Sequence, residues 1–318
     1  MTTELISISI FWEAQQFLRI INEGKVLYSD LENSYLKRQA SLTLIELEKV
    51  IDFCSRSGQI ILENDKILPT QLGKDILKKI PSNNSSVPAA RIQFLSYIRE
   101  FRPFWATSLT KGRKKSMTYV PEIIRDIFEQ LQLYDSNKVL TDKEVVSWWD
   151  EISTALYSSA QANNIKVGRI GERLSMLYEE YRTGSSPVWV ALEDNSAGYD
   201  LYSVQSNTDE TSMCVEVKTC SSKDSNVHIS KNEWRTADSK PPSAYVFHIW
   251  DISSINTPLL HIISPNVFKS HVPKNSGIGE WNDCVFKYPA IVKEKAFNHR
   301  VINTFPNQIT EFLKEARL

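Results

Sequence analysis

The sequence predicts an α/β protein in which a mainly helical first half precedes a mixed β-sheet flanked by helices. Through residues 1–164, apolar residues recur at three- and four-residue spacing, as they do in helices that face a core. Beyond residue 165, short runs rich in β-branched and aromatic residues alternate with turn residues and one helical stretch. A chain of 318 residues is long enough for two domains. We expect a winged-helix-like domain at 1–80, a linker and helical region at 81–164, and an α/β domain at 165–318.

The composition is that of an ordinary water-soluble protein, with 42% hydrophobic and 24% charged residues. No apolar run reaches 18 residues and the beginning lacks a secretory pattern, so we expect a cytoplasmic protein without a membrane span. The four cysteines and five histidines are scattered, which disfavours a structural zinc site. A net charge of -1 means that any nucleic-acid binding must use local basic patches.

The first 80 residues have the element order of a winged helix. Thr43 and Glu46 have the spacing of a capping box before an apolar helical stretch, and Gly58 ends that helix. Two short β-segments then flank residues 63–65, and another helix runs to residue 77. The helix before the hairpin carries mixed charge, which favours a scaffold or dimerisation role over DNA contact. Its exposed charged residues are Glu46, Glu48, Lys49, Asp52 and Arg56.

Residues 81–88, rich in proline, serine and asparagine, are predicted to be a linker. Helices are expected at 89–101, 121–133 and 142–163. Between the first two lies the densest basic cluster of the chain, formed by Lys111, Arg113, Lys114 and Lys115. A short charge run of this kind is either a solvated loop or a contact to a phosphate backbone, and both readings stay open.

The second half begins with a helix that extends to about residue 181. Residues 264–318 carry no motif that indicates a function, although 307–316 has the pattern of a helix. A helix at 231–237 interrupts a series of predicted strands, at 188–192, 199–204, 213–219, 245–250 and 259–263.

The strand at 213–219 carries an acid and a lysine among apolar residues. Because alternate residues of a strand share a face, Glu216 and Lys218 project together, about 7 Å apart at their Cα atoms. Met213, Val215 and Val217 point the other way, into a core. Two charges on a strand of this kind are costly unless they are paired or exposed, and an ordinary salt bridge is the alternative interpretation.

Asp200 begins the preceding strand, from which it can reach Glu216. Two carboxylates suit Mg²⁺, which prefers oxygen ligands and keeps several waters. The backbone carbonyl of Val217 is a third candidate ligand. Lys218 would then lie beside a metal-bound water, where an ammonium can orient the water and stabilise developing charge.

Asp200 followed by Glu216-Val217-Lys218 resembles the PD-(D/E)xK motif of the restriction-endonuclease-like superfamily, with Tyr199 in place of the proline. Four segments in order resemble one branch of it, the nuclease-like domain found at the carboxyl end of the plant protein NO VEIN and in many bacterial defence-associated proteins. They are 168–172, 197–200, 215–219 and 229–234.

The resemblance implies a restriction-endonuclease-like mixed sheet in residues 165–318 and a Mg²⁺-dependent DNA endonuclease of restriction or anti-phage defence. Mn²⁺ is expected to substitute for Mg²⁺. Double-strand cleavage needs two sites, so a homodimer is expected, and a partner protein of a defence system is a further expectation. The alternative is a catalytically inactive nuclease-fold protein that binds DNA or regulates.

The resemblance also makes Glu172 the helix acid that completes the metal site through water, whereas a solvated helix glutamate is the plainer interpretation. Glu233 has capping-box spacing from Ser230, and we interpret it as a helix cap. Lys231 and Arg235 lie one helical turn apart and are candidate phosphate contacts.

Overall fold

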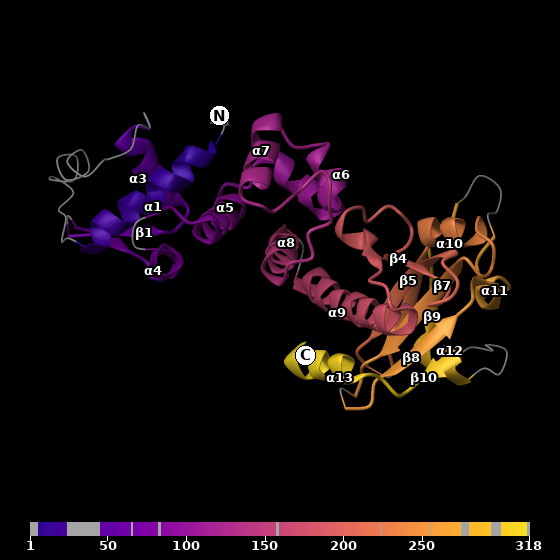
Figure 1. The fold of residues 1–318 in the computed structure, drawn as a ribbon. Coiled ribbons are helices and arrows are strands. Elements are labelled where there is room, and N and C mark those ends of the chain that lie inside the picture. Colours follow the sequence, from indigo (N-terminus) through magenta and orange to yellow (C-terminus); the bar gives the residue numbers. More distant parts are fainter. Residues whose placement is uncertain are drawn as a thin grey trace. The chain divides into compact units, whose positions relative to one another are not determined.

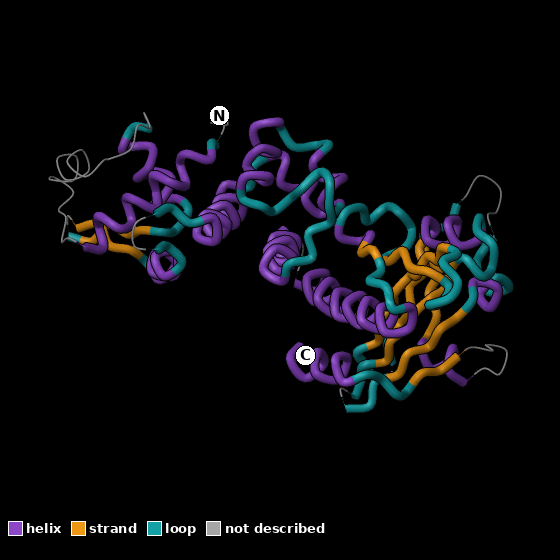
Figure 2. Tube along the Cα trace, viewed as in Figure 1, coloured by secondary structure: helices purple, strands orange, loops and turns teal. Residues whose placement is uncertain are grey.

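A computed structural model describes residues 6–23, 45–64, 66–81, 84–156, 159–222, 224–254, 256–274, 280–293 and 300–316. The chain forms two compact units, one from residues 1–110 and 116–157 and the other from 111–115 and 158–318. The first is helical apart from one hairpin, and the second contains the larger sheet (Figures 1 and 2). The predicted α/β class, with a helical first half, is confirmed.

The N-terminal unit contains the expected helix, hairpin and helix. Helix α3 (Leu47–Arg56) is followed by Gly58, whose φ of 71° is the left-handed conformation expected after a helix end. Strands β1 (Ile60–Glu63) and β2 (Lys66–Pro69) pair in antiparallel register, and α4 (Gln71–Lys78) follows, capped by Thr70. Thr43 of the predicted capping box lies outside the described residues.

Residues 84–110 and 116–156 share one core with the described residues of the first 80, so the predicted boundary at residue 80 does not separate two domains. Helix α5 (Val87–Phe101) buries Phe94 completely, and this ring lies 5.7 Å from Phe11 and 5.1 Å from Phe128. Ser86, in the predicted linker, is itself buried: Gln15 of α1 (Ile8–Glu23) accepts from its N–H and donates to its carbonyl. Apolar side chains and this amide contact join the segments, whereas the composition of 81–88 suggested a free connection.

The helices predicted at 121–133 and 142–163 are present with shorter bounds, as α7 (Glu122–Gln130) and α8 (Lys143–Leu156). Two further helices, η2 (Phe104–Lys111) and α6 (Arg113–Met117), were not predicted. Helix α6 begins in the segment 111–115, which belongs to the C-terminal unit.

The C-terminal unit is built on a six-stranded sheet with the order β10-β8-β7-β5-β4-β3. Only β5 and β7 run parallel among its described pairings, because the chain between them crosses over through β6 (Asn226–Ser230) and α10 (Lys231–Asp238). The strands are β3 (Val188–Trp189), β4 (Leu201–Val204), β5 (Ser212–Cys220), β7 (Tyr245–Asp251), β8 (Leu259–Ile263) and β10 (Arg300–Ile302). The strands predicted at 213–219, 245–250 and 259–263 are confirmed.

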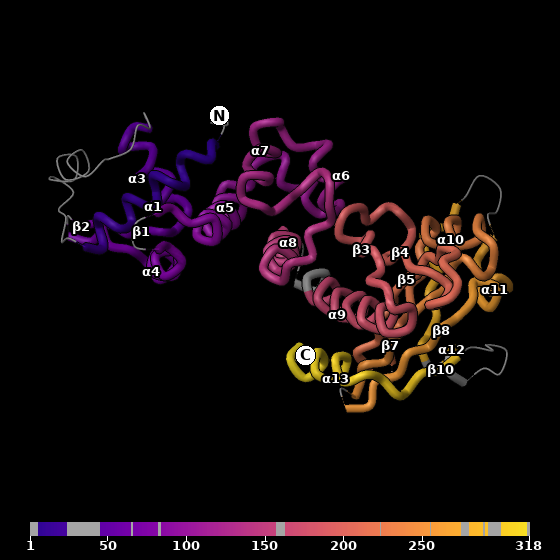
Figure 3. Tube along the Cα trace, viewed as in Figure 1, coloured from indigo at the N-terminus to yellow at the C-terminus, as the bar shows by residue number. Residues whose placement is uncertain are grey.

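Helices lie on both sides of this sheet (Figure 1). Helix α9 (Ser159–Thr183) packs on β5, and α13 (Asn307–Ala316) packs on α9. The chain colours in Figure 3 lead from β5 to α10 (Lys231–Asp238). Strand β6 (Asn226–Ser230) pairs with β9 (Asp283–Lys287) in a second, two-stranded sheet.

The segment after residue 263, in which only a helix at 307–316 was predicted, supplies one strand to each of the two sheets of the C-terminal unit. It contributes β9, β10, the short helices α11 (Pro265–Phe268) and α12 (Tyr288–Lys293), and α13 at the predicted 307–316. No helix among the described residues has the length and apolar character that crossing a membrane requires.

Helix α9 packs tightly on β5 at Gly171. A Cβ atom at this position would lie 1.9 Å from Thr219 Oγ1 and 3.3 Å from Val217 Cγ1. Only a glycine therefore allows this helix to pack on the strand without displacing either element.

We expect Gly171→Ala to lower the free energy of unfolding of the C-terminal unit by about 1–3 kcal/mol, because its methyl group overpacks this contact. Gly168→Ala, one turn earlier in the same helix, is the matched control. A Cβ there meets nothing within 4 Å, so alanine should stabilise by up to about 1 kcal/mol through helix propensity. Urea unfolding monitored by circular dichroism measures both, and equal effects would contradict the packing argument.

Candidate active site

Strand β5 holds the predicted acid and lysine at the centre of the sheet. Met213, Val215 and Val217 are buried, as the alternation predicted, and Val217 faces Gly171 of α9. Glu216 projects to the opposite face and is only 4% exposed. The Lys218 side chain is 17% exposed, so one end of the pair reaches solvent.

Asp200 is fixed beside β5 by hydrogen bonds of both its backbone and its side chain. Its N–H donates to the carbonyl of Val215, the residue that Leu201 faces in the β4–β5 pairing, at 2.9 Å. Its own carbonyl turns away and accepts from the N–H groups of Val190 and Ala191. The Asp200 Oδ2 atom takes over the missing ladder position and accepts from Val217 N–H at 2.7 Å. The hydrogen bond from Val217 N–H to the Asp200 side chain places the Asp200 carboxylate beside Glu216 of β5.

Gly198 makes the approach to Asp200 possible. Its φ of 80° is in the left-handed region, and a Cβ atom would lie 2.3 Å from Thr236 Oγ1 of α10. The Gly198 carbonyl accepts from the Tyr245 hydroxyl at 2.8 Å. The turn before Asp200 is therefore held by α10 and by β7.

Lys218 bridges two carboxylates. Its Nζ lies 2.8 Å from Glu216 Oε1 and 2.9 Å from Glu233 Oε2. Glu233 also forms the predicted capping box with Ser230: its N–H donates to Ser230 Oγ, and its Oε2 accepts from Ser230 N–H. Sequence reasoning identified the cap and missed the ion pair, because no spacing rule relates a strand residue to a helix fifteen residues later.

The acids of this cluster repel one another in a desolvated setting. Burial and the nearby Glu172 carboxylate raise the pKa of Asp200 to about 7. Burial and the Asp200 carboxylate likewise hold the pKa of Glu216 well above its usual range. Burial lowers the pKa of Lys218, but the surrounding carboxylates raise it more, so this side chain stays an ammonium. The single positive charge of Lys218 therefore cannot neutralise the carboxylates of Asp200, Glu216 and Glu233 around it.

Glu172 of α9 is held at the edge of this cluster. Its Oε2 accepts from the Trp189 indole N–H and from the guanidinium of Arg169, and its side chain is 14% exposed. Glu172 is therefore an ordered, paired carboxylate and not a solvated one. The role that the resemblance gives it, completing a metal site through water, stays a prediction.

The Val217 carbonyl points to the same edge of β5 as the Asp200 carboxylate. In a strand, the N–H and C=O of one residue point to the same neighbour, and Val217 N–H points to Asp200. Strand β4 begins only at Leu201, opposite Val215, so β5 extends past it at this point. This orientation is the one that a metal ligand would need.

The oxygens present suit a hard divalent cation. Among the described residues, no three histidine, cysteine or acidic side chains are already gathered into a metal-binding group. Mg²⁺ does not require such a cage, because it binds through one or two carboxylates and fills its remaining positions with water and substrate oxygens. Asp200 and Glu216 provide two carboxylates that each have an oxygen outside the hydrogen bonds described above.

The basic segment 111–115 packs against residues 193–196 of the same unit. Lys111 O accepts from Asn195 N–H, and Lys115 N–H donates to Glu193 O, both at 3.3 Å. Arg113 is 1% exposed and its guanidinium lies 3.8 Å from Glu193. The prediction that Arg113 contacts nucleic acid is therefore corrected, since a buried guanidinium cannot meet a phosphate.

The other predicted phosphate contacts differ in exposure. Lys111, Lys114 and Arg235 are exposed. Lys115 is half-buried, donates to Ser196 Oγ and lies 3.8 Å from Asp194. Lys231 pairs with Glu280, and its side chain is 17% exposed. Three of the predicted basic side chains are thus open to solvent and two are already engaged with neighbouring groups.

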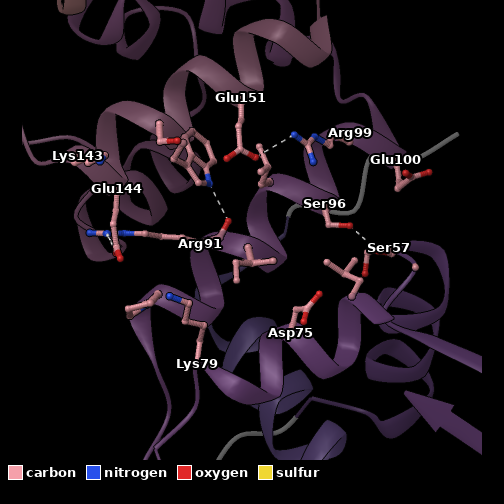
Figure 4. Close-up of a pocket in the computed structure, with 17 residues that line it drawn as sticks. Ser57, Asp75, Lys79, Arg91, Ser96, Arg99, Glu100, Lys143, Glu144 and Glu151 are labelled. Atoms are coloured by element: carbon pink, nitrogen blue, oxygen red, sulfur yellow. Dashed lines mark hydrogen bonds and ion pairs between the residues drawn. The ribbon is translucent and has the colours of Figure 1, made fainter. Parts of the chain in front are cut away.

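The N-terminal unit contains a cleft of about 840 Å³ formed by the end of α3 together with α4, α5 and α8 (Figure 4). Acidic and basic side chains line it in equal number, and two ion pairs lie among them, with Arg99 3.3 Å from Glu151 and Arg91 3.9 Å from Glu144. Because these charges compensate each other, the cleft does not select a ligand of either sign, and we assign it no function.

Residues 171–263 match the family described as "Protein NO VEIN, C-terminal". The resemblance to this family is confirmed for that segment, which is less than a third of the chain. The NO VEIN-like segment begins at Gly171 and contains Asp200, Glu216, Lys218 and Glu233. No curated protein and no solved structure matches the chain. Membership of the PD-(D/E)xK superfamily stays a prediction.

The raised pKa of Asp200 predicts how the stability of the protein changes with pH. A carboxyl group that binds its proton more tightly when folded stabilises the fold below its ordinary pKa of 3.8, and this contribution is lost as pH rises through about 7. Relative to Asp200→Asn, the wild type should lose on the order of 1–3 kcal/mol of unfolding free energy between pH 5 and pH 8. Urea unfolding in EDTA measures this, and parallel pH profiles of the two proteins would rule it out.

Proposed function

We propose that the protein is a metal-dependent phosphodiesterase that cleaves DNA, acting in restriction or anti-phage defence. The observation that carries the proposal is the pair of carboxylates formed by the half-buried Asp200, just before β4, and the buried Glu216 of β5, with Lys218 beside Glu216. The NO VEIN-like segment that contains all three supports it.

The charge balance of the cluster supports a cation ligand. A buried ion pair contributes little net stability, because desolvation offsets its Coulombic energy. Here the Asp200 and Glu216 carboxylates both repel and are desolvated, so the metal-free cluster is held at a cost. A divalent cation would remove this cost, since it neutralises both carboxylates at once.

Each residue would then have a separate task. Asp200 and Glu216 would hold Mg²⁺ through their carboxylates, and Val217 through its carbonyl. The bound cation would polarise the scissile phosphate and favour ionisation of an attacking water. Lys218 would orient that water and stabilise the charge that develops on the phosphate oxygens. Glu172, held by Trp189 and Arg169, would fix a water at the edge of the site.

DNA is the substrate class that we favour. Lys114 and Arg235 are exposed on the segments that flank the 193–200 turn leading into Asp200. Contacts from basic side chains to phosphates position a duplex without reading its sequence. A homodimer would supply the second site needed for double-strand cleavage, and a partner protein of a defence system would supply activation.

The second candidate is a catalytically inactive nuclease-fold protein that binds DNA or regulates. The specific observation in its favour is that the Lys218 ammonium is already engaged by Glu216 and Glu233. An ion-pair network of this kind would order the sheet without chemistry.

Cleavage assays separate the two. Wild-type protein with Mg²⁺ or Mn²⁺ should cleave plasmid DNA, and Ca²⁺ should not support turnover. Asp200→Asn, Glu216→Gln and Lys218→Ala should each lose about a hundredfold or more of activity, because each removes a metal ligand or a group that stabilises the transition state. Single-stranded DNA and RNA tested in parallel define the substrate.

Glu210→Gln removes an exposed carboxylate from the loop after β4 and serves as the control, with activity unchanged. Equal activity of the wild type and all three site variants would contradict the proposed catalytic roles of these residues. Absence of cleavage by every protein would favour the inactive, DNA-binding candidate.

DNA affinity tests the basic surface. In a Lys218→Ala background, Lys114→Glu and Arg235→Glu should each weaken binding and reduce the slope of log affinity against log salt by about 1, since each removes one phosphate contact. Lys314→Glu changes the net charge equally on α13 and should have a smaller effect. Fluorescence anisotropy with a labelled duplex measures all three, and identical losses would show that only net charge matters.

A further inference from the structure

Glu233 occupies a position that its capping role does not explain. Its Oε2 accepts from Ser230 N–H and from Lys218 Nζ, both at 2.9 Å. A capping box requires only an acceptor at this position, which either glutamine or glutamate provides. The hydrogen bonds of the cap therefore do not require the negative charge of Glu233, and the charged group that it contacts is the Lys218 ammonium.

The capping box fixes the direction of this carboxylate. Ser230 Oγ accepts from Glu233 N–H at 3.2 Å while the Glu233 side chain turns back to Ser230 N–H. Lys231 N–H donates to Asn282 O at 2.7 Å, so the start of α10 is also tied to the segment before β9. Glu233 is thus a preset acceptor, because its position does not depend on Lys218.

Lys218 has two carboxylate partners, and only one of them is a candidate metal ligand. Its Nζ lies 2.8 Å from Glu216 Oε1, which competes directly with any cation for Glu216. Glu233 offers the ammonium a second anchor at 2.9 Å. An ammonium has three donors, so Lys218 can release Glu216 and remain bound to Glu233.

We propose that Glu233 is a positioning residue that holds the Lys218 ammonium beside the site when Glu216 turns its carboxylate to a divalent cation. The inference rests on the proposed function of Asp200 and Glu216 as cation ligands. Without the Glu233 charge, Lys218 would pair with Glu216 alone and oppose cation binding. Because the Glu233 carboxylate is held by the cap, it also keeps the Lys218 ammonium in place when Glu216 moves toward the cation.

The test compares Glu233→Gln with Ser230→Ala in the full chain. Glu233→Gln keeps an acceptor for the cap and removes the charge, whereas Ser230→Ala removes half of the cap and keeps the charge. Mn²⁺ affinity is measured by calorimetry on each protein, and kcat and KM on plasmid DNA are measured separately. Glu280→Gln, which removes a carboxylate paired with Lys231, controls for the loss of one negative charge near α10.

Glu233→Gln should bind Mn²⁺ about tenfold more weakly, as expected when a group that orients a metal-site residue is lost. Its kcat should fall while KM stays near the wild-type value, and Glu233→Asp should restore part of both losses. Ser230→Ala and Glu280→Gln should keep the wild-type affinity for Mn²⁺. Equal losses in Ser230→Ala and Glu233→Gln would mean that the cap alone matters, and unchanged affinity in Glu233→Gln would overturn the proposal.

A crystal structure with Mn²⁺, located by its anomalous signal, gives a readout that is independent of activity. Lys218 Nζ should remain within hydrogen-bond distance of Glu233 while Glu216 contacts the metal. A metal bound by Glu233 itself, or a Lys218 that has left Glu233, would refute the inference. Metal binding as expected without any cleavage would refute the proposed nuclease function and leave Glu233 in its role, whereas a protein that binds no divalent cation would refute both.

Discussion

The hydrogen bond from Val217 N–H to the Asp200 carboxylate is the contact on which both the sheet and the site depend. Strand β4 begins only at Leu201, and the carbonyl of the preceding Asp200 accepts from Val190 and Ala191, so β4 offers no backbone acceptor to Val217. Without a side-chain acceptor, the Val217 N–H would be unsatisfied, at a cost of about 1–3 kcal/mol if it stayed dry. One oxygen of the Asp200 carboxylate thus accepts the Val217 N–H, and the other oxygen is available to a metal ion. An asparagine at position 200 can still accept this hydrogen bond but lacks the negative charge that a metal ligand needs. Its effects on folding and on function can therefore be separated.

The opposite face of the sheet determines where α9 sits. Ser175 Oγ accepts from the Trp250 indole at 2.8 Å and lies 3.2 Å from His248 Nδ1. Further along the helix, the buried Glu179 pairs with Arg182 and accepts from Ser203 Oγ. Burial lowers the pKa of His248 to about 4, so this network contains a neutral imidazole near neutral pH. These polar contacts and Gly171 fix the helix along its axis, and Glu172 reaches the site edge as a consequence.

Local patterns predicted what lies within one element, and failed where distant segments meet. Alternation along β5 was sufficient to place Glu216 and Lys218 on one face, and capping spacing predicted the start of α10 at Ser230. The burial of Arg113 was not predictable from its basic neighbours, because it depends on Glu193, eighty residues away in the chain. The bridge from Lys218 to Glu233 has the same origin, since it requires the crossover that returns α10 over the end of β5. Strands β6 and β9 were missed because they pair with each other across more than fifty residues.

Lys218, protons and a divalent cation all compete for the same carboxylate oxygens. The ammonium neutralises part of the charge on Glu216, and the raised pKa of Asp200, about 7, leaves its proton partly bound near neutrality. A cation must displace that proton, so its apparent affinity should increase with pH until Asp200 is fully ionised. It must also displace the lysine from Glu216, and this step costs less if the ammonium keeps a second carboxylate. In a site with only two acids and one lysine, the lysine and the metal would compete for the same carboxylate. Glu233, a third acid fixed by its helix cap, reduces this competition because it offers the ammonium another partner.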